Sequence, residues 1–191
     1  GGKQGVRMTE FDSFSTQLLE ESKALLEKAK SAEPFTQSAY MHAGLLLTMS
    51  ALEACLNSMA EELLIEPYGD SYTVYERALL LEKEVRFERG EYYLSNSLKI
   101  SRITDRIEFL YYKFTGAKLS GNDPWYMALK QSIDLRNRLV HPKEHVQLTV
   151  KQVEAAVSSV VNTINELYLA VYKRGYPAAD RGVESKYAIV S

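Results

Sequence analysis

An arginine, an asparagine and a histidine stand close together in the stretch "RNRLVHPK", residues 136–143. On a helix with 3.6 residues per turn, Asn137 and His141 are one turn apart on the same face, and the long side chain of Arg136 can reach them. Histidine exchanges protons near neutral pH, and the forked guanidinium of arginine suits phosphate. The asparagine amide can orient the imidazole or a substrate hydroxyl. Together these residues suit proton transfer around a phosphodiester.

Basic residues surround this motif although the chain as a whole is not basic. Its 191 residues include 23 Lys+Arg and 25 Asp+Glu, a formal net charge of -2, which excludes a protein that coats nucleic acid nonspecifically. Any contact with nucleic acid must therefore be local. The expected RNA-binding residues are Lys130, Arg138, Lys143 and Lys151, with only Asp134 and Glu144 as acids among them.

The motif "RNRLVHP" resembles the R-x4-6-H signature of the HEPN superfamily (higher eukaryotes and prokaryotes nucleotide-binding), in which a polar residue typically follows the arginine. Arg136, Asn137 and His141 match those three positions. The resemblance extends to the apolar helix "LLLTMSALEACLNSMAEEL" and to the helical layout over roughly residues 36–172. It implies an antiparallel helical bundle.

The resemblance also implies a metal-independent endoribonuclease with no cofactor, of the kind found in toxin and defence systems. His141 would act as general acid or base, Arg136 would stabilise the charge on the phosphate, and Asn137 would orient them. The RNA 2'-hydroxyl would attack and leave a 2',3'-cyclic phosphate. Family members generally form homodimers in which two motifs face a shared cleft, and an antitoxin or nucleotidyltransferase-type partner is expected.

Two polar residues interrupt the apolar helix and are expected to support the motif. Glu53 and Asn57 are one turn apart among apolar neighbours, so each needs a polar partner. That partner is either another helix, through a buried hydrogen bond, or Arg136. A salt bridge from Glu53 to Arg136 would satisfy both alternatives.

Other interpretations of the motif remain open. The same residues can form a noncatalytic module that binds nucleotide, RNA or a protein partner, or His141 can simply cap a helix end. His145 and His141 in "HPKEH" have a spacing that could hold zinc on one helical face. Pro142 breaks a continuous helix there, and no third ligand is evident, so no metal site is expected.

Apolar periodicity predicts an all-α fold. Helices are expected over residues 9–30, 36–64, 73–88, 98–114, 123–140 and 149–175, and those between the second and the fifth form a helical insertion. Gly90 is expected to cap the third helix, Asp123 to cap the motif helix and Thr149 the last. "EYYLSNSLK", residues 91–99, is assigned to a loop, although its aromatic residues would also suit a short strand.

The chain is expected to form one domain over residues 9–175, preceded by a terminus of residues 1–8 and followed by a tail of residues 176–191. Cys55 is the only cysteine, which excludes an intrachain disulfide and favours a reduced, cytoplasmic setting. Glu53 and Asn57 lie near the middle of the most apolar window. This window is therefore interpreted as a buried helix of a soluble protein and not as a membrane span.

Overall fold

A computed structural model describes residues 10–65 and 71–187 of the chain, with side chains from residue 13 onward. The expected terminus of residues 1–8 lies outside this range. Most of the described chain is helical, in the order α1 (Glu10–Ser31), α2 (Pro34–Leu63), α3 (Val74–Leu81), α4 (Ile103–Thr115), α5 (Pro124–Val140) and α6 (Val150–Tyr172). The strands β1 (Lys83–Glu88) and β2 (Glu91–Leu98) lie between α3 and α4.

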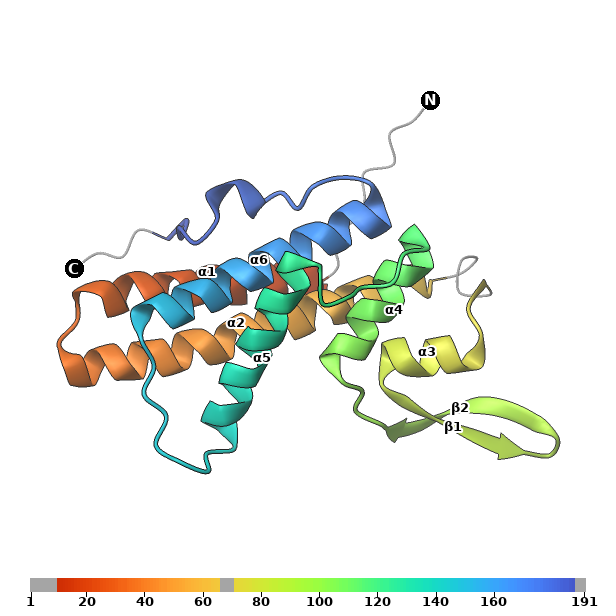
Figure 1. The fold of residues 1–191 in the computed structure, drawn as a ribbon. Helices are drawn as coiled ribbons and strands as arrows, with labels where there is room; N and C mark the ends of the chain where they lie inside the picture. Colours follow the sequence, from red (N-terminus) through yellow and green to blue (C-terminus); the bar gives the residue numbers. More distant parts are fainter. Residues whose placement is uncertain (1–9, 66–70, 188–191) are drawn as a thin grey trace.

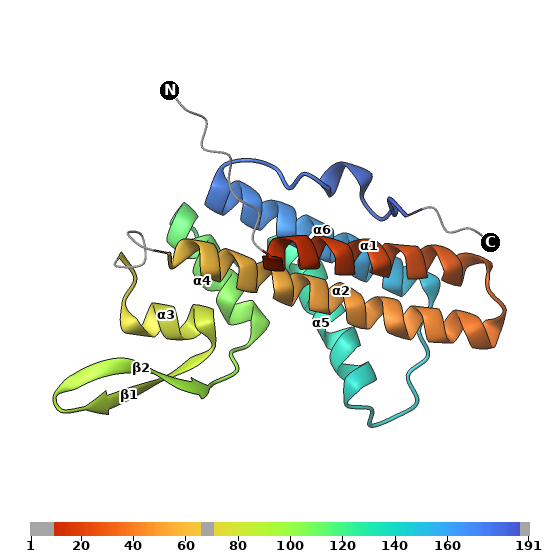
Figure 2. The same ribbon diagram turned by 180° about the vertical axis from the view of Figure 1, so that it is seen from behind.

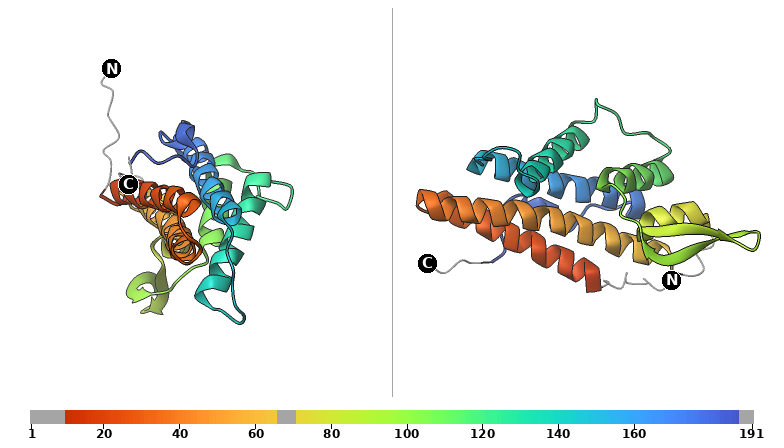
Figure 3. Two further views of the ribbon diagram at one scale, coloured as in Figure 1. Left: turned by 90° about the vertical axis from the view of Figure 1, so that its left-hand side faces the viewer. Right: turned by 90° about the horizontal axis from the view of Figure 1, so that it is seen from below.

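The helices pack around α2 and α6. α1 and α2 lie side by side along their length, and α6 contacts both of them (Figure 1). α4 and α5 pack on the other side of α6 from α1, as the end-on view in Figure 3 shows. The centre is filled by fully buried apolar side chains from five helices, including Leu19, Leu52, Leu56, Ile107, Leu129, Val157 and Ile164.

The apolar helix α2 owes its composition to this position. It is long and apolar enough to cross a membrane, but 67% of its most apolar window is buried inside the protein. Its buried residues include Leu45, Met49 and Cys55. Packing against α1 and α6 therefore accounts for the hydropathy of this segment.

The region after α2 differs from the expected run of helices. The predicted third helix, residues 73–88, is wrong beyond Leu81, because Glu82 adopts a left-handed conformation and ends α3. Residues 83–98 form an antiparallel hairpin instead, so the loop assignment for residues 91–99 and the helix start at residue 98 are wrong as well. The fold is mainly α, with one small hairpin that projects from the helices beside α3 (Figures 1 and 3).

The turn of this hairpin explains the error. Glu88 pairs with Glu91, which leaves Arg89 and Gly90 as a two-residue loop, and both have positive φ (53° and 90°). Two positive φ angles are typical of the tight turn whose twist matches the flanking strands. Gly90 therefore serves a hairpin turn and not the end of a helix.

The ends of the other helices are mostly as predicted. Thr149 caps α6 and accepts a hydrogen bond from the N–H of Gln152 in a capping box. Asp123 precedes α5 but makes no capping hydrogen bond. Its carboxylate accepts hydrogen bonds from Ser120 instead, so the prediction that Asp123 caps α5 is wrong in this respect.

Residues 176–187 run back over α1 and α6 (Figure 2). Tyr176 and Ala178 are buried. The carboxylate of Glu20, itself buried in α1, accepts hydrogen bonds from Arg181 and from the N–H of Lys186. This segment therefore packs as a strap against the first helix.

Candidate functional site

The motif lies in the last turns of α5. The helix ends at Val140, and His141 follows with φ -121° and ψ 65°, its N–H donating to the carbonyl oxygen of Asn137 at 2.8 Å. Pro142 disfavours helical backbone at the preceding residue and so accounts for this end. Asn137 and His141 are exposed, whereas Arg136 is half-buried against α2.

The predicted salt bridge between α2 and α5 is confirmed. Arg136 Nη2 lies 3.5 Å from Glu53 Oε1, with 24% of the arginine side chain and 52% of the glutamate side chain exposed. Within the described chain, Arg136 Nε is buried and has no hydrogen-bond partner. Glu53 therefore holds the guanidinium in place without using all of its donors.

Asn57 pairs with a residue that the sequence did not single out. Its side-chain oxygen accepts a hydrogen bond of 2.7 Å from Arg106 Nη2 of α4. This partly buried bond to another helix matches the first of the two alternatives considered for Asn57. Arg106 is 3% exposed at its side chain and also lies 3.5 Å from Glu82. Burial lowers the pKa of Arg106, and the nearby charges of Glu82 and Glu53 oppose this change.

Helical spacing with Ile103 and Ile107 places Arg106 on the apolar face of α4, and this is the one local sign that it is buried. The charges elsewhere in the helix mask that sign, and the sequence does not identify the partners of its guanidinium. Its position depends on α2 and on the loop that carries Glu82.

Two clefts meet at Asn137. The first, here the arginine cleft, has a volume of about 540 Å³ and is lined by residues of α2, α4 and α5 and of the segment before α4, among them Glu53, Asn57, Glu82, Arg102, Arg106, Arg136 and Asn137. The second, here the histidine pocket, has a volume of about 510 Å³ and is lined by Asn137, Arg138, His141, Lys143, Glu144 and Val146. Asn137 thus lies between the arginine side and the histidine side of the motif.

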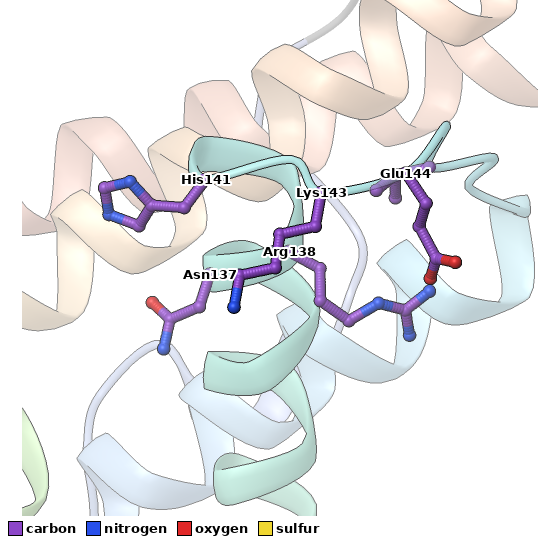
Figure 4. Close-up of a pocket in the computed structure, with 6 residues that line it drawn as sticks. Asn137, Arg138, His141, Lys143 and Glu144 are labelled. Atoms are coloured by element: carbon purple, nitrogen blue, oxygen red, sulfur yellow. The ribbon is translucent and has the colours of Figure 1, made fainter.

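The side chains of the histidine pocket diverge from the end of α5. His141 and Asn137 extend to the same side of the helix, and Lys143 reaches toward Asn137, whereas Arg138 extends toward Glu144 (Figure 4). Within the described residues, the His141 imidazole has no hydrogen-bond partner. It is therefore free to contact a ligand or another molecule.

Two of the four predicted RNA-binding cations line one of the clefts. Arg138 and Lys143 line the histidine pocket. Lys130 lies two turns earlier on α5, with its Nζ 5.3 Å from the centre of the Tyr126 ring. Lys151 is exposed in the first turn of α6 and lines neither cleft.

No metal-binding cluster was found in the described part of the chain: over residues 10–65 and 71–187, no three His, Cys, Asp or Glu side chains gather in a way that could hold a metal ion. His145, which the sequence pairs with His141, is exposed and lies outside both clefts. The polar groups that line the two clefts at the motif include the amide, the imidazole and the cations already described, together with the carboxylates of Glu53 and Glu144.

Comparison of the chain with protein-family models, with curated proteins and with solved structures found no match.

Proposed function

We propose that this protein is a HEPN-type endoribonuclease that cuts RNA without a metal ion, through Arg136, Asn137 and His141. The observation that carries the proposal is the position of Asn137, which lines both the arginine cleft and the histidine pocket. A phosphodiester placed over Asn137 can be approached by a fixed cation on one side and by an imidazole on the other. These are two of the groups that transesterification of RNA needs.

In this mechanism the 2'-hydroxyl attacks the adjacent phosphorus and loses its proton to a general base. The P–O5' bond breaks, the leaving oxygen takes a proton from a general acid, and a 2',3'-cyclic phosphate remains. Arg136, held by Glu53, neutralises the charge that develops on the phosphate oxygens. His141 supplies proton transfer on one side of the reaction.

The reaction needs both an acid and a base, whereas each chain carries one histidine in its histidine pocket. A homodimer that brings two histidine pockets together would supply both groups, and we propose this assembly. We also propose a cytoplasmic protein held in check by an antitoxin or a nucleotidyltransferase-type partner. Sedimentation of the purified protein tests the dimer directly.

The decisive experiment is cleavage of mixed tRNA, rRNA and mRNA by purified protein in excess EDTA, with analysis of the product ends. We expect cyclic-phosphate ends, and a loss of about 10²–10⁴-fold in rate for His141→Ala. His145→Ala is the matched control, because His145 is exposed four residues away and lines neither cleft. Equal loss in both variants, or no cleavage by folded dimeric wild type, would contradict the nuclease.

A second candidate is a noncatalytic module that binds a phosphate-bearing ligand at the same place. It is favoured by the pairing of Arg136 with Glu53, which leaves the guanidinium partly neutralised, and by the absence of any hydrogen bond that would orient the His141 ring among the described residues. RNA binding that weakens with Arg138→Ala, in a protein that never cleaves, would select this function.

A further inference from the structure

The arginine cleft continues past the motif to the beginning of α4. Its lining includes Ser101, Arg102, Ile103 and Thr104, which lead into and open that helix, together with the buried Arg106 one turn later. These residues come from the segment for which the sequence suggested no function. The cleft is therefore larger than the site that Arg136 alone would need.

The charges of the cleft favour an anion. Its lining contains three arginines, at positions 102, 106 and 136, against two glutamates, at positions 53 and 82, which leaves one positive charge in excess on a chain of net charge -2. Both glutamates are already engaged: Glu53 pairs with Arg136, and Glu82 pairs with Arg106 and accepts from the N–H of Ser101 at 3.1 Å.

The guanidinium of Arg106 forms a fixed part of the wall of the arginine cleft. Its side chain is 3% exposed, its Nη atoms are directed by Glu82 and Asn57, and its Nε is buried without a hydrogen-bond partner in the described chain. Keeping such a cation buried is costly unless it is well paired. An anion in the cleft would offset part of that cost.

The N-terminus of α4 faces the same space. Arg102 is the N-cap residue, and its side chain makes no capping hydrogen bond. The N–H groups of Ile103 and Thr104 lie in the first turn, where no preceding turn of the helix offers a carbonyl. First-turn N–H groups and the helix dipole together favour an anion at this end of a 13-residue helix.

From these observations we infer that the arginine cleft holds a second phosphate-binding site, formed by Arg102, Arg106 and the first-turn N–H groups of α4. Arg102 is the exposed member: its side chain is 84% exposed, and its contact with Asp105, at 3.2 Å, is an exposed ion pair that costs little to exchange. Arg106 is the fixed member. Guanidinium groups and helix N-termini both suit the tetrahedral oxygens of phosphate.

The natural source of this phosphate is the backbone of a single-stranded nucleic acid. Because the arginine cleft and the histidine pocket share Asn137, one strand can place a phosphate at α4 and a neighbouring phosphate at the motif. This assignment rests on the proposed function, since it takes RNA as the ligand of the motif. The site at α4 would then position the strand and not take part in bond breaking.

Two probes test the site without relying on cleavage. The first is inorganic phosphate, followed by amide chemical shifts: we expect saturable shifts at Ile103 and Thr104 that Arg102→Ala diminishes. The second is a short single-stranded DNA oligonucleotide, which lacks the 2'-hydroxyl and cannot be cut by the proposed route. Arg174→Ala is the matched control, because Arg174 is an exposed arginine after α6 that lines neither cleft.

For the oligonucleotide, losing one phosphate contact should lower the slope of log affinity against log salt by about 0.7. If wild type and Arg102→Ala have equal affinity at 1 M salt, this difference in slope makes the affinity of Arg102→Ala about eightfold weaker near 50 mM salt. Arg174→Ala should bind like wild type. Phosphate shifts at α4 without an effect on the oligonucleotide would support the site but assign it to free phosphate.

The site is overturned if phosphate leaves Ile103 and Thr104 unmoved. Its assignment to a nucleic-acid strand is overturned if Arg102→Ala and Arg174→Ala bind the oligonucleotide equally. The cleavage assay is a separate readout. Wild type that binds the oligonucleotide through Arg102 and yet never cuts RNA would contradict the nuclease and support the phosphate site. Cleavage of RNA by wild type, with no phosphate shifts at Ile103 and Thr104, would support the nuclease and contradict the phosphate site.

Discussion

Replacing Asn57 with alanine should destabilise the protein through Arg106. The side-chain oxygen of Asn57 accepts a hydrogen bond of 2.7 Å from Arg106 Nη2. Alanine removes this acceptor and leaves a cationic N–H, on a side chain that is 3% exposed, with one partner fewer. A hydrogen bond to a charged group is worth about 1.5–3 kcal/mol.

Two features of the structure set the expected magnitude. Asn57 and Arg106 line the arginine cleft, so water can replace part of the lost bond, which favours the lower half of that range, about 1.5–2 kcal/mol. Alanine also has a higher helix propensity than asparagine, by up to about 0.7 kcal/mol. We therefore expect a net loss near 1 kcal/mol in the free energy of unfolding, or about 2–4 °C in Tm for a chain of this size.

The assay is urea unfolding of Asn57→Ala beside Asn137→Ala. Asn137 is exposed on α5, and no described side chain hydrogen-bonds its amide, so its replacement gains the same propensity and loses no such bond. The difference between the two variants should be about 1.5–2 kcal/mol, which isolates the bond to Arg106. Asn57→Asp, which keeps the acceptor and adds an opposite charge, should be at least as stable as Asn57→Ala. Equal stability of the two alanine variants would refute the reasoning.

Three further predictions concern other polar contacts. Glu53→Gln should change the free energy of unfolding by less than about 1 kcal/mol, because the pair of Glu53 with Arg136 is half exposed. The same variant should lower kcat for RNA cleavage. An unchanged kcat would show that the pair does not position the arginine. Burial, together with the hydrogen bond that the Tyr126 hydroxyl donates to Glu108, raises the pKa of Tyr126. The folded protein therefore keeps a proton that the unfolded chain loses, and the free energy of unfolding should fall as pH rises above about 10. Tyr126→Phe should lose less stability over that range in denaturant melts. Burial raises the pKa of Glu20, but hydrogen bonds from Lys186 N–H and Arg181 outweigh it and leave the pKa lowered. The stability that the ionised Glu20 contributes is therefore present above about pH 4.5 and lost as pH falls. Faster proteolysis of residues 176–187 in acid, and in Arg181→Ala at pH 7, would reveal this contribution.

The helices and the motif were predictable because they depend on neighbours along the chain. The apolar periodicity of α1, α2, α5 and α6, the proline at the start of α5 and the capping box of Thr149 are all local. The pairing of Glu53 with Arg136 was predictable for a different reason: a carboxylate amid apolar residues needs a partner, and the motif offered a cation.

The hairpin was not predictable from the same signals. Residues 83–98 mix good helix formers with aromatic and β-branched residues, so local propensity does not decide between helix and strand. Glycine is common both at the C-terminal end of a helix and in a tight turn, so Gly90 does not distinguish the two structures. The pairing of Val85 with Leu94 and of Phe87 with Tyr92 across the turn, and their contact with α3, decide the matter in the tertiary structure.

The sequence by itself therefore determined the mainly helical class, the helix that carries the motif and the grouping of Asn137 and His141 on one of its faces. Only the tertiary structure decided that Arg106 is buried beside Asn57, that Glu82 holds it, and that the start of α4 opens into the same cleft as Arg136. The physical reason is the distance along the chain between the residues that interact. Helix periodicity is set by residues three and four apart, whereas the buried Arg106 is defined by partners 24 and 49 residues away in the chain, Glu82 and Asn57.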